Sequence, residues 1–168
     1  MKTLIRSFLV INAMYFGLTA CSIIQALGPK SAHVSSYLPG MSHDILMDTV
    51  REIEISSGEP FLSEARSHFV ITVEYGDLDD HTLGQAFTNR RSFCIIKINN
   101  KINPERNIGY SPFDLQAILT HEIGHCFGLA HNPNPSSIMY WSYDRNQNSP
   151  NSFMDFINDL KKIRGVKN

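Results

Sequence analysis

Residues 121–131 read HEIGHCFGLAH and contain three of the seven histidines of the chain. His121 and His125 are four residues apart, so on a helix both imidazoles lie on one face and can reach one ion. Glu122 lies beside them, close enough to act on a water molecule bound to that ion. Gly128 permits a sharp turn, after which His131 can return as a third ligand. Three neutral imidazoles with one open position are typical of a catalytic zinc site, whereas structural zinc sites usually have four protein ligands.

The spacing therefore predicts hydrolysis assisted by one catalytic zinc ion. The zinc would lower the pKa of its water, and Glu122 would take the proton as general base. The resulting hydroxide would attack a carbonyl group that the zinc polarises.

The metal-binding stretch lies on a predicted helix with a strong start signal. Residues 111–114 read SPFD, which combines a capping box between Ser111 and Asp114 with proline at the first helical position. Gly128 is well placed to end this helix.

The residues before this helix predict a small sheet and a further helix. Apolar residues at helical spacing predict a helix over residues 43–56, capped by Ser42 and followed by Gly58. Strands are expected over residues 68–75, 83–88 and 92–99. A short first strand is expected near residues 34–38. In the last strand Cys94, Ile96 and Ile98 share one face.

The first twenty residues have the order of an export signal. Lys2 and Arg6 precede an apolar run over residues 8–18, and small residues follow it. Residues 18–21 read LTAC and resemble the lipobox of bacterial lipoproteins, in which the cysteine is acylated and becomes the new N-terminus. An ordinary secretion signal that contains a cysteine is the alternative interpretation.

These features predict three segments. Residues 1–20 form a lipoprotein signal peptide, residues 21–40 contain the lipidated Cys21 and a tether, and residues 41–168 form one catalytic domain. The mature protein is then expected to be a monomer anchored to a membrane of the bacterial cell envelope through Cys21. Neither the membrane nor its leaflet follows from the sequence.

The charge balance excludes one class of partner. The chain has 15 Lys and Arg and 16 Asp and Glu, which gives a formal net charge of -1. Without an excess of cationic side chains to neutralise phosphates, nucleic acid is not an expected partner.

Two cysteines remain after Cys21. Cys94 and Cys126 are an even count in a compartment that permits disulfides. The strand face of Cys94 and the helix stripe of Cys126 both predict burial between sheet and active helix. A disulfide and two separate buried thiols are both compatible with this pattern.

At these residues the sequence resembles a known family. The pattern HExxHxxGxxH resembles the metzincin zinc metalloproteases at every fixed position, and Met139, eight residues after His131, resembles their Met-turn. The short gap between His131 and Met139, and Tyr140 directly after Met139, resemble the matrixin branch of this family. The resemblance extends more weakly over residues 42–165. It implies an α+β fold: a small twisted mixed sheet with two long helices, a Met-turn and a closing C-terminal helix over residues 153–165.

The resemblance also implies a protein or peptide substrate and a cleft that binds it. The edge strand that receives an extended peptide would include Leu83, Gly84, Gln85 and Ala86. Residues 139–143 would wall the pocket for the side chain just past the scissile bond. The aromatic side chains of Tyr140, Trp141 and Tyr143 suggest that this wall is apolar.

Two departures from the matrixin pattern matter. Matrixins usually hold a second, structural zinc through histidines, but the matching positions here are Tyr75 and Gln85, so one zinc ion is expected. The acidic residues 77–80 with His81 could hold a cation, although a solvated acidic turn is the favoured interpretation. The thiolate latency segment of matrixins is also missing from residues 22–40.

Two other functions remain open. The protein could be a surface-anchored binding module that zinc merely stabilises, but retention of Glu122 argues against this because a structural ion needs no base. It could also be a zinc amidase that acts on cell-wall peptides, a hypothesis that the edge strand disfavours only by family resemblance.

Overall fold

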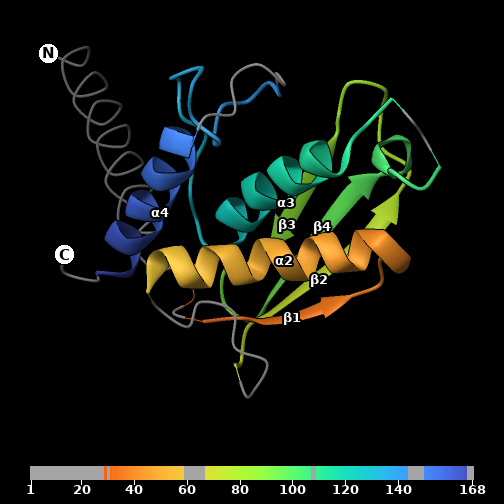
Figure 1. Cartoon of the computed structure of the whole chain (residues 1–168). Coiled ribbons are helices and arrows are strands. Elements are labelled where there is room, and N and C mark those ends of the chain that lie inside the picture. The colour runs from red at the N-terminus through yellow and green to blue at the C-terminus, as the bar shows by residue number, and fades with distance from the viewer. Residues whose placement is uncertain (1–28, 30, 59–66, 107–108, 144–149, 166–168) are drawn as a thin grey trace, which may run out of the picture.

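A four-stranded mixed sheet with helices across one face forms the fold (Figure 1). The computed structural model describes residues 29, 31–58, 67–106, 109–143 and 150–165. The strand order is β1-β2-β4-β3, with β1 over His33–Ser36, β2 over Val70–Gly76, β3 over Gly84–Thr88 and β4 over Phe93–Asn99. The expected α+β class with a small mixed sheet is confirmed.

The two central strands carry the apolar face of the sheet. Ile71 and Val73 of β2 are fully buried and pair in parallel with Cys94 and Ile96 of β4, which are also fully buried. Alternation along each strand sends these side chains to one face. The predicted shared face of β4 is therefore confirmed, and it packs under the helices.

Strand β3 is an edge strand of the sheet, and it contacts the helix that carries His121 and His125. It pairs antiparallel with β4, from Gly84 opposite Ile98 to Thr88 opposite Cys94. In the described part of the chain β3 has a neighbouring strand on one side only. Its other backbone edge is therefore available to a further strand.

Helix α2 spans Gly40–Ser57 and begins earlier than the sequence predicted. Its N-cap residue is Pro39, not Ser42, and the backbone N–H of Met41 donates to the carboxylate of Glu105 at 2.6 Å. The hydroxyl of Ser42 is buried and hydrogen-bonded to the hydroxyl of Tyr75 at 2.8 Å. The prediction of a Ser42 cap was wrong because a carboxylate distant in sequence satisfies the start of this helix.

Helix α3 spans Pro112–Cys126 and starts as predicted. Ser111 Oγ accepts from the backbone N–H of Asp114, and the carboxylate of Asp114 accepts from the backbone N–H of Ser111. Gly128 follows the helix with a φ of 97°, a conformation that glycine adopts without strain. Leu115, Leu119 and Ile123 are fully buried on the face of α3 that packs in the core.

Helix α4 closes the fold. It spans Pro150–Arg164, three residues earlier at its start than predicted, and contacts α2. Phe156, Ile157 and Leu160 are buried at helical spacing. A 3-10 turn, η1 over Asn100–Ile102, follows β4. The expected closing helix is present.

The folded unit includes residues that the sequence assigned to the tether. β1 pairs in parallel with β2, with His33 opposite Val70, and the N–H of Tyr37 donates to Val73 O at 2.8 Å. Ala32 and Leu38 are buried. The short first strand expected near residues 34–38 thus lies at His33–Ser36, and its pairing with β2 brings residues before position 41 into the sheet.

The predicted signal peptide and Cys21 lie outside the described residues. Among the residues that the structure describes, no helix has both the length and the apolar character needed to cross a membrane.

A disulfide joins the sheet to the active helix. Cys94 of β4 and Cys126 at the end of α3 are bonded across 32 residues of sequence, and both are fully buried. The sequence left this pairing open, and the structure decides for the bridge. The disulfide holds the end of the metal-binding helix against the central strands.

Removing this bridge is expected to destabilise the fold. The double variant Cys94→Ala, Cys126→Ala should lose about 2–4 kcal/mol in free energy of unfolding, because the unfolded chain gains freedom. Urea denaturation measures the difference. In a Cys21→Ser background, alkylation of the denatured, unreduced protein should modify no cysteine, and two modified thiols would disprove the bridge.

Candidate metal centre and substrate cleft

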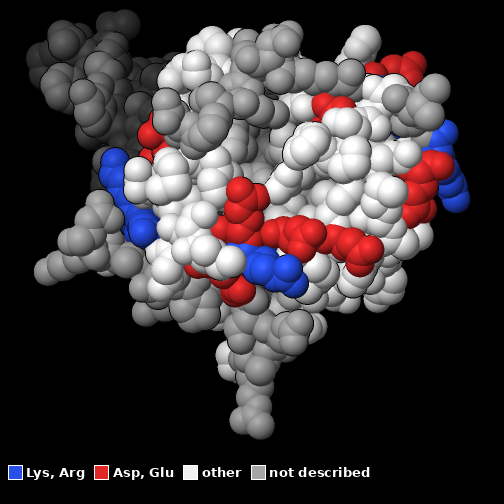
Figure 2. All heavy atoms as spheres, viewed as in Figure 1, with Lys and Arg blue, Asp and Glu red and all other residues white. Residues whose placement is uncertain are grey.

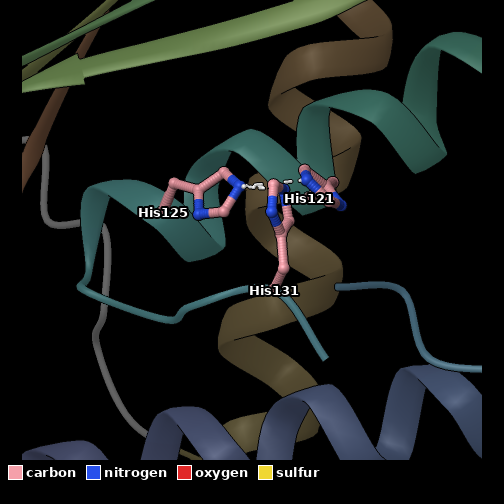
Figure 3. A group of neighbouring side chains, drawn as sticks. All are labelled: His121, His125 and His131. Carbon is pink, nitrogen blue, oxygen red and sulfur yellow. Dashed lines mark hydrogen bonds between the residues drawn. The ribbon is translucent and has the colours of Figure 1, made fainter. Parts of the chain in front are cut away.

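Three histidine side chains converge at one point, as Figure 3 shows. His121 and His125 come from successive turns of α3, and His131 comes from the segment after it. His125 Nε2 lies 3.0 Å from His121 Nε2 and 3.2 Å from His131 Nε2. The structure therefore brings together the three histidines that the sequence predicted as metal ligands.

Backbone carbonyl groups orient two of these rings. His121 Nδ1 lies 2.7 Å from Ile138 O, and His125 Nδ1 lies 2.8 Å from Leu129 O. A carbonyl oxygen can only accept, so each Nδ1 carries the proton and each Nε2 presents a lone pair. Such outer contacts fix the tautomer of histidine ligands. Nε2 lone pairs that face one another at these distances need a cation between them.

The nitrogen positions fit zinc. Two nitrogens bound to one zinc ion at about 2.0–2.1 Å with a tetrahedral angle lie roughly 3.3–3.4 Å apart. The observed separations of 3.0 and 3.2 Å are close to that value. Among the described residues, these three histidines are close enough to one another to hold a metal ion together.

The protonation states also suit a cation. Burial lowers the pKa of His121 to about 4 and lowers the pKa of His125, while the carbonyl contacts act in the opposite direction. Both imidazoles are therefore neutral near pH 7, the state that a metal ligand requires.

Glu122 lies between α3 and β3. Burial raises the pKa of its carboxyl to about 7, and a hydrogen bond from the backbone N–H of Ala86 acts in the opposite direction. A cation at the three imidazoles would favour the ionised form further. The side chain is thus held at the cleft, where it can accept a proton near neutral pH.

A glycine on β3 makes room for this carboxyl group. A Cβ atom on Gly84 would lie 2.9 Å from Glu122 Oε1 and 2.8 Å from Ile118 Cγ2. Any other residue would require Ile118, Glu122 or β3 itself to shift. Gly84, which the sequence predicted as a substrate contact, therefore also sets the distance between the edge strand and Glu122.

Met139 packs behind the metal site. Its side chain is buried, and a Cβ atom on Gly124 would lie 2.6 Å from Met139 Sδ. The N–H of Asn132 donates to Met139 O at 2.8 Å, which links the segment of His131 to this turn. The turn thus contacts His121 through Ile138 O, and it holds the segment of His131 through the hydrogen bond from Asn132.

A cavity of about 740 Å³ surrounds the metal centre. The three histidines and Glu122 line it, and so do all six substrate-contact residues predicted from the sequence: Leu83, Gly84, Gln85, Ala86, Tyr140 and Tyr143. Trp141 also lines it but is 61% exposed, so it contributes little to an enclosed wall.

The acidic loop before β3 is a hydrogen-bonded turn. The carboxylate of Asp79 accepts from the backbone N–H groups of His81 and Thr82, and Asp77 accepts from Asn100 Nδ2 at 2.7 Å. This arrangement agrees with the favoured interpretation of a solvated turn.

Some residues of the site were missed by sequence reasoning. Leu129 and Ile138 act through backbone carbonyls, which leave no trace in the sequence. Ala117 lines the cavity one helical turn before His121, and that spacing could have identified it.

Comparison with known proteins identifies relatives. Residues 28–165 match the Matrixin peptidase family. Metalloendoproteinase 1 of Glycine max is 38% identical over 88 residues, which cover 50% of this chain and 29% of that protein. Matrix metalloproteinase-20 of Homo sapiens is 28% identical over 149 residues, covering 79% of this chain and 30% of that protein. The chain thus spans about 30% of the length of these curated relatives.

Solved structures share the fold. The GM1-bound form of the ECX AB5 holotoxin superimposes with a TM-score of 0.54 and 17% identity, covering 84% of this chain and 82% of that chain. Archaemetzincin from Methanopyrus kandleri gives a TM-score of 0.53 and 16% identity, covering 80% and 95% of the two chains. At these identities the similarity supports the fold alone.

Proposed function

Because this chain belongs to the matrixin family of metalloproteases, we propose that it is a zinc-dependent endopeptidase that cleaves peptide bonds beside His121, His125 and His131. One observation carries the proposal. Three imidazole Nε2 atoms converge in a cleft whose wall also holds the buried carboxyl of Glu122. A purely structural ion would need neither the cleft nor the carboxyl.

The chemistry divides between the ion and the protein. A zinc ion held there would polarise the scissile carbonyl and lower the pKa of a water molecule beside it. The Glu122 carboxylate takes the proton of the attacking water and can return it to the leaving amine. The hydrogen bond from Ala86 holds that carboxylate in place during both transfers.

The edge strand suggests how a substrate binds. β3 lines the cleft and has an unpaired backbone edge among the described residues. An extended peptide that adds as a strand to β3 would have its backbone aligned with the three histidines. This geometry favours a peptide chain over a compact cell-wall amide.

Metal content provides the first test. We expect one tightly bound zinc ion per chain, because Tyr75 and Gln85 stand where matrixins place ligands of a second ion. Elemental analysis after mild dialysis measures the ratio. Two zinc ions per chain would contradict this prediction.

Turnover provides the second part of the same test. A peptide library incubated with the purified protein should show cleavage that a chelator abolishes and added zinc restores. Binding of zinc and peptides without any cleavage would instead favour the zinc-stabilised binding module.

We also propose that the mature protein is attached to the cell envelope through Cys21. The order of charged, apolar and small residues before Cys21 supports this proposal. Metabolic labelling with an alkyne fatty acid should mark the wild type and not Cys21→Ser. Equal labelling of the two proteins would disprove the anchor.

A further inference from the structure

The turn between β3 and β4 combines exposed aromatic rings with exposed cations. Residues 87–93 read FTNRRSF, and we call them the hairpin tip. Phe87 and Phe93 are 43% and 44% exposed, and Arg90 and Arg91 between them are exposed as well. Large apolar side chains that gather at a surface with a polar rim mark sites that contact a protein or a membrane.

The two phenylalanines lie on the face of the sheet opposite the helices. Phe87 is paired with Ile95 of β4, and paired residues of neighbouring strands lie on the same face. Phe93 precedes Ile95 by two residues and therefore shares that face, whereas Cys94 between them is fully buried in the core under the helices. The hairpin tip thus ends in an apolar patch on the outer side of the sheet.

The arginines of the hairpin tip have no acidic partner within the described residues. Neither Arg90 nor Arg91 takes part in an ion pair there. The sequence itself contains no aspartate or glutamate between Asp80 and Glu105. Both guanidinium groups are therefore free to bind an anionic surface.

The backbone of the hairpin tip is satisfied by its own side chains. Asn89 Oδ1 accepts from the N–H groups of residues 91–93, and Thr88 Oγ1 accepts from the N–H of Arg90. Burial of an unpaired polar group away from water costs free energy. Because these N–H groups are already paired, the tip can leave bulk water without that cost.

The chain enters the sheet at the same end as the hairpin tip. His33 of β1 is paired with Val70 of β2, and Val70 is paired with Phe93 at the start of β4. Neighbouring strands are about 4.8 Å apart, so His33 lies roughly 10 Å from Phe93 across this row. The chain from Cys21 to His33 can span at most roughly 40 Å. An acyl group on Cys21 would therefore keep this end of the sheet close to a bilayer.

The charge on the other side of the sheet favours the same orientation. In Figure 1 helix α2 crosses the face of the sheet that the helices cover, and Figure 2, viewed in the same way, shows acidic side chains gathered over this helix. Asp44, Asp48 and Glu52 are exposed on α2. An anionic surface repels these carboxylates and attracts the two arginines of the hairpin tip, so it turns the tip toward itself.

We propose that the hairpin tip docks on the surface of a bilayer that contains anionic phospholipids. Arg90 and Arg91 bind the headgroup phosphates, and the rings of Phe87 and Phe93 enter the boundary between headgroups and acyl chains. The anchor proposed at Cys21 supplies only the direction of approach, since the free cations and the exposed rings make the contact without it. Arg90 also lines the metal cleft, so docking places one end of that cleft beside the membrane.

Quenching of a fluorophore on the hairpin tip tests this contact in the full chain. Ser92→Cys provides an exposed thiol for the fluorophore, while Cys94 and Cys126 stay in their disulfide. Vesicles of brominated phosphatidylcholine with an equal amount of phosphatidylglycerol should quench the fluorophore, and vesicles of brominated phosphatidylcholine alone should quench it much less. The same fluorophore at Asp48→Cys on α2 should stay unquenched. The wild type, treated with the same reagent, gives the background.

Paired substitutions show whether the tip arginines cause the docking. Arg90→Gln with Arg91→Gln should lower the docking equilibrium by about 20-fold, because each arginine near an anionic bilayer contributes about fivefold. Arg51→Gln with Arg106→Gln removes the same charge from exposed positions outside the tip and should leave the docking equilibrium nearly unchanged. Arg90→Gly should lose about fivefold and still fold, because Arg90 has a φ of 58° that glycine adopts without strain. Circular dichroism checks each variant.

The outcomes separate this inference from the other proposals, since peptide turnover has no part in the measurement. An unquenched fluorophore at position 92 in the anionic vesicles, or equal docking of the two double arginine variants, would overturn the inference. A dimer in solution that Phe93→Ser dissociates, without quenching by lipid, would also overturn it and assign the apolar patch to a second copy of the chain. Quenching that depends on Arg90 and Arg91 in a protein without a fatty acid would support the docking and refute only the anchor at Cys21.

Discussion

Replacing Glu122 with alanine is expected to lower peptide turnover by about 10²–10⁴-fold, the usual effect of removing a general base. The zinc content should stay at the wild-type level, because Glu122 is not among the three converging ligands. The measurement pairs kcat/KM on a cleaved library peptide with elemental analysis of the same preparation.

Glu122→Gln is the matched control for packing. It keeps the size of a buried side chain that touches the position of Gly84 and an acceptor for the Ala86 N–H, but it cannot take the proton. It should lose activity to a similar extent as Glu122→Ala. Turnover close to that of the wild type in either variant would rule out Glu122 as the base.

Replacing His125 with alanine is expected to abolish both zinc binding and activity. Its Nε2 atom lies within 3.2 Å of the Nε2 atoms of both other histidines. Its loss therefore leaves only two imidazoles to bind the ion. Changes to outer-shell partners of metal ligands already cost 10–100-fold in affinity, so the loss of a ligand should exceed roughly 100-fold. Zinc titration with a competing chelator measures the affinity.

His43→Ala serves as the control for His125→Ala. His43 is exposed on α2 and lies outside the histidine trio, so its loss should leave zinc affinity unchanged. Together the Glu122 and His125 variants separate catalysis from metal binding, since the first loses only turnover and the second loses both. Zinc affinity of His125→Ala equal to that of the wild type would disprove the assigned ligand set.

Much of the fold followed from local patterns. The capping box of Ser111 and Asp114 set the start of α3, and alternation along residues 93–99 placed Cys94 and Ile96 in the core. These signals depend on residues within a few positions of each other. The geometry of a single helix or strand is enough to interpret them.

Predictions failed where a distant residue replaced a local one. Ser42 has the right type for a helix cap, yet Glu105 accepts the N–H at the start of α2 and Ser42 instead bonds to Tyr75. The short first strand was expected near residues 34–38, but its position at His33–Ser36 comes from pairing with β2. Such partners lie tens of residues away and have no periodicity that a sequence reveals.

The spacing of the histidines was enough to predict the metal site, because the period of the α-helix places His121 and His125 on one face and Gly128 lets His131 return. The support of the three histidines and the residues around them could not be predicted in this way, because they depend on contacts between distant segments. The carbonyls of Ile138 and Leu129 and the space at Gly84 arise from the packing of separate elements. Local spacing sets which atoms can bind an ion, whereas the approach of distant segments sets the shape and charge of the cleft.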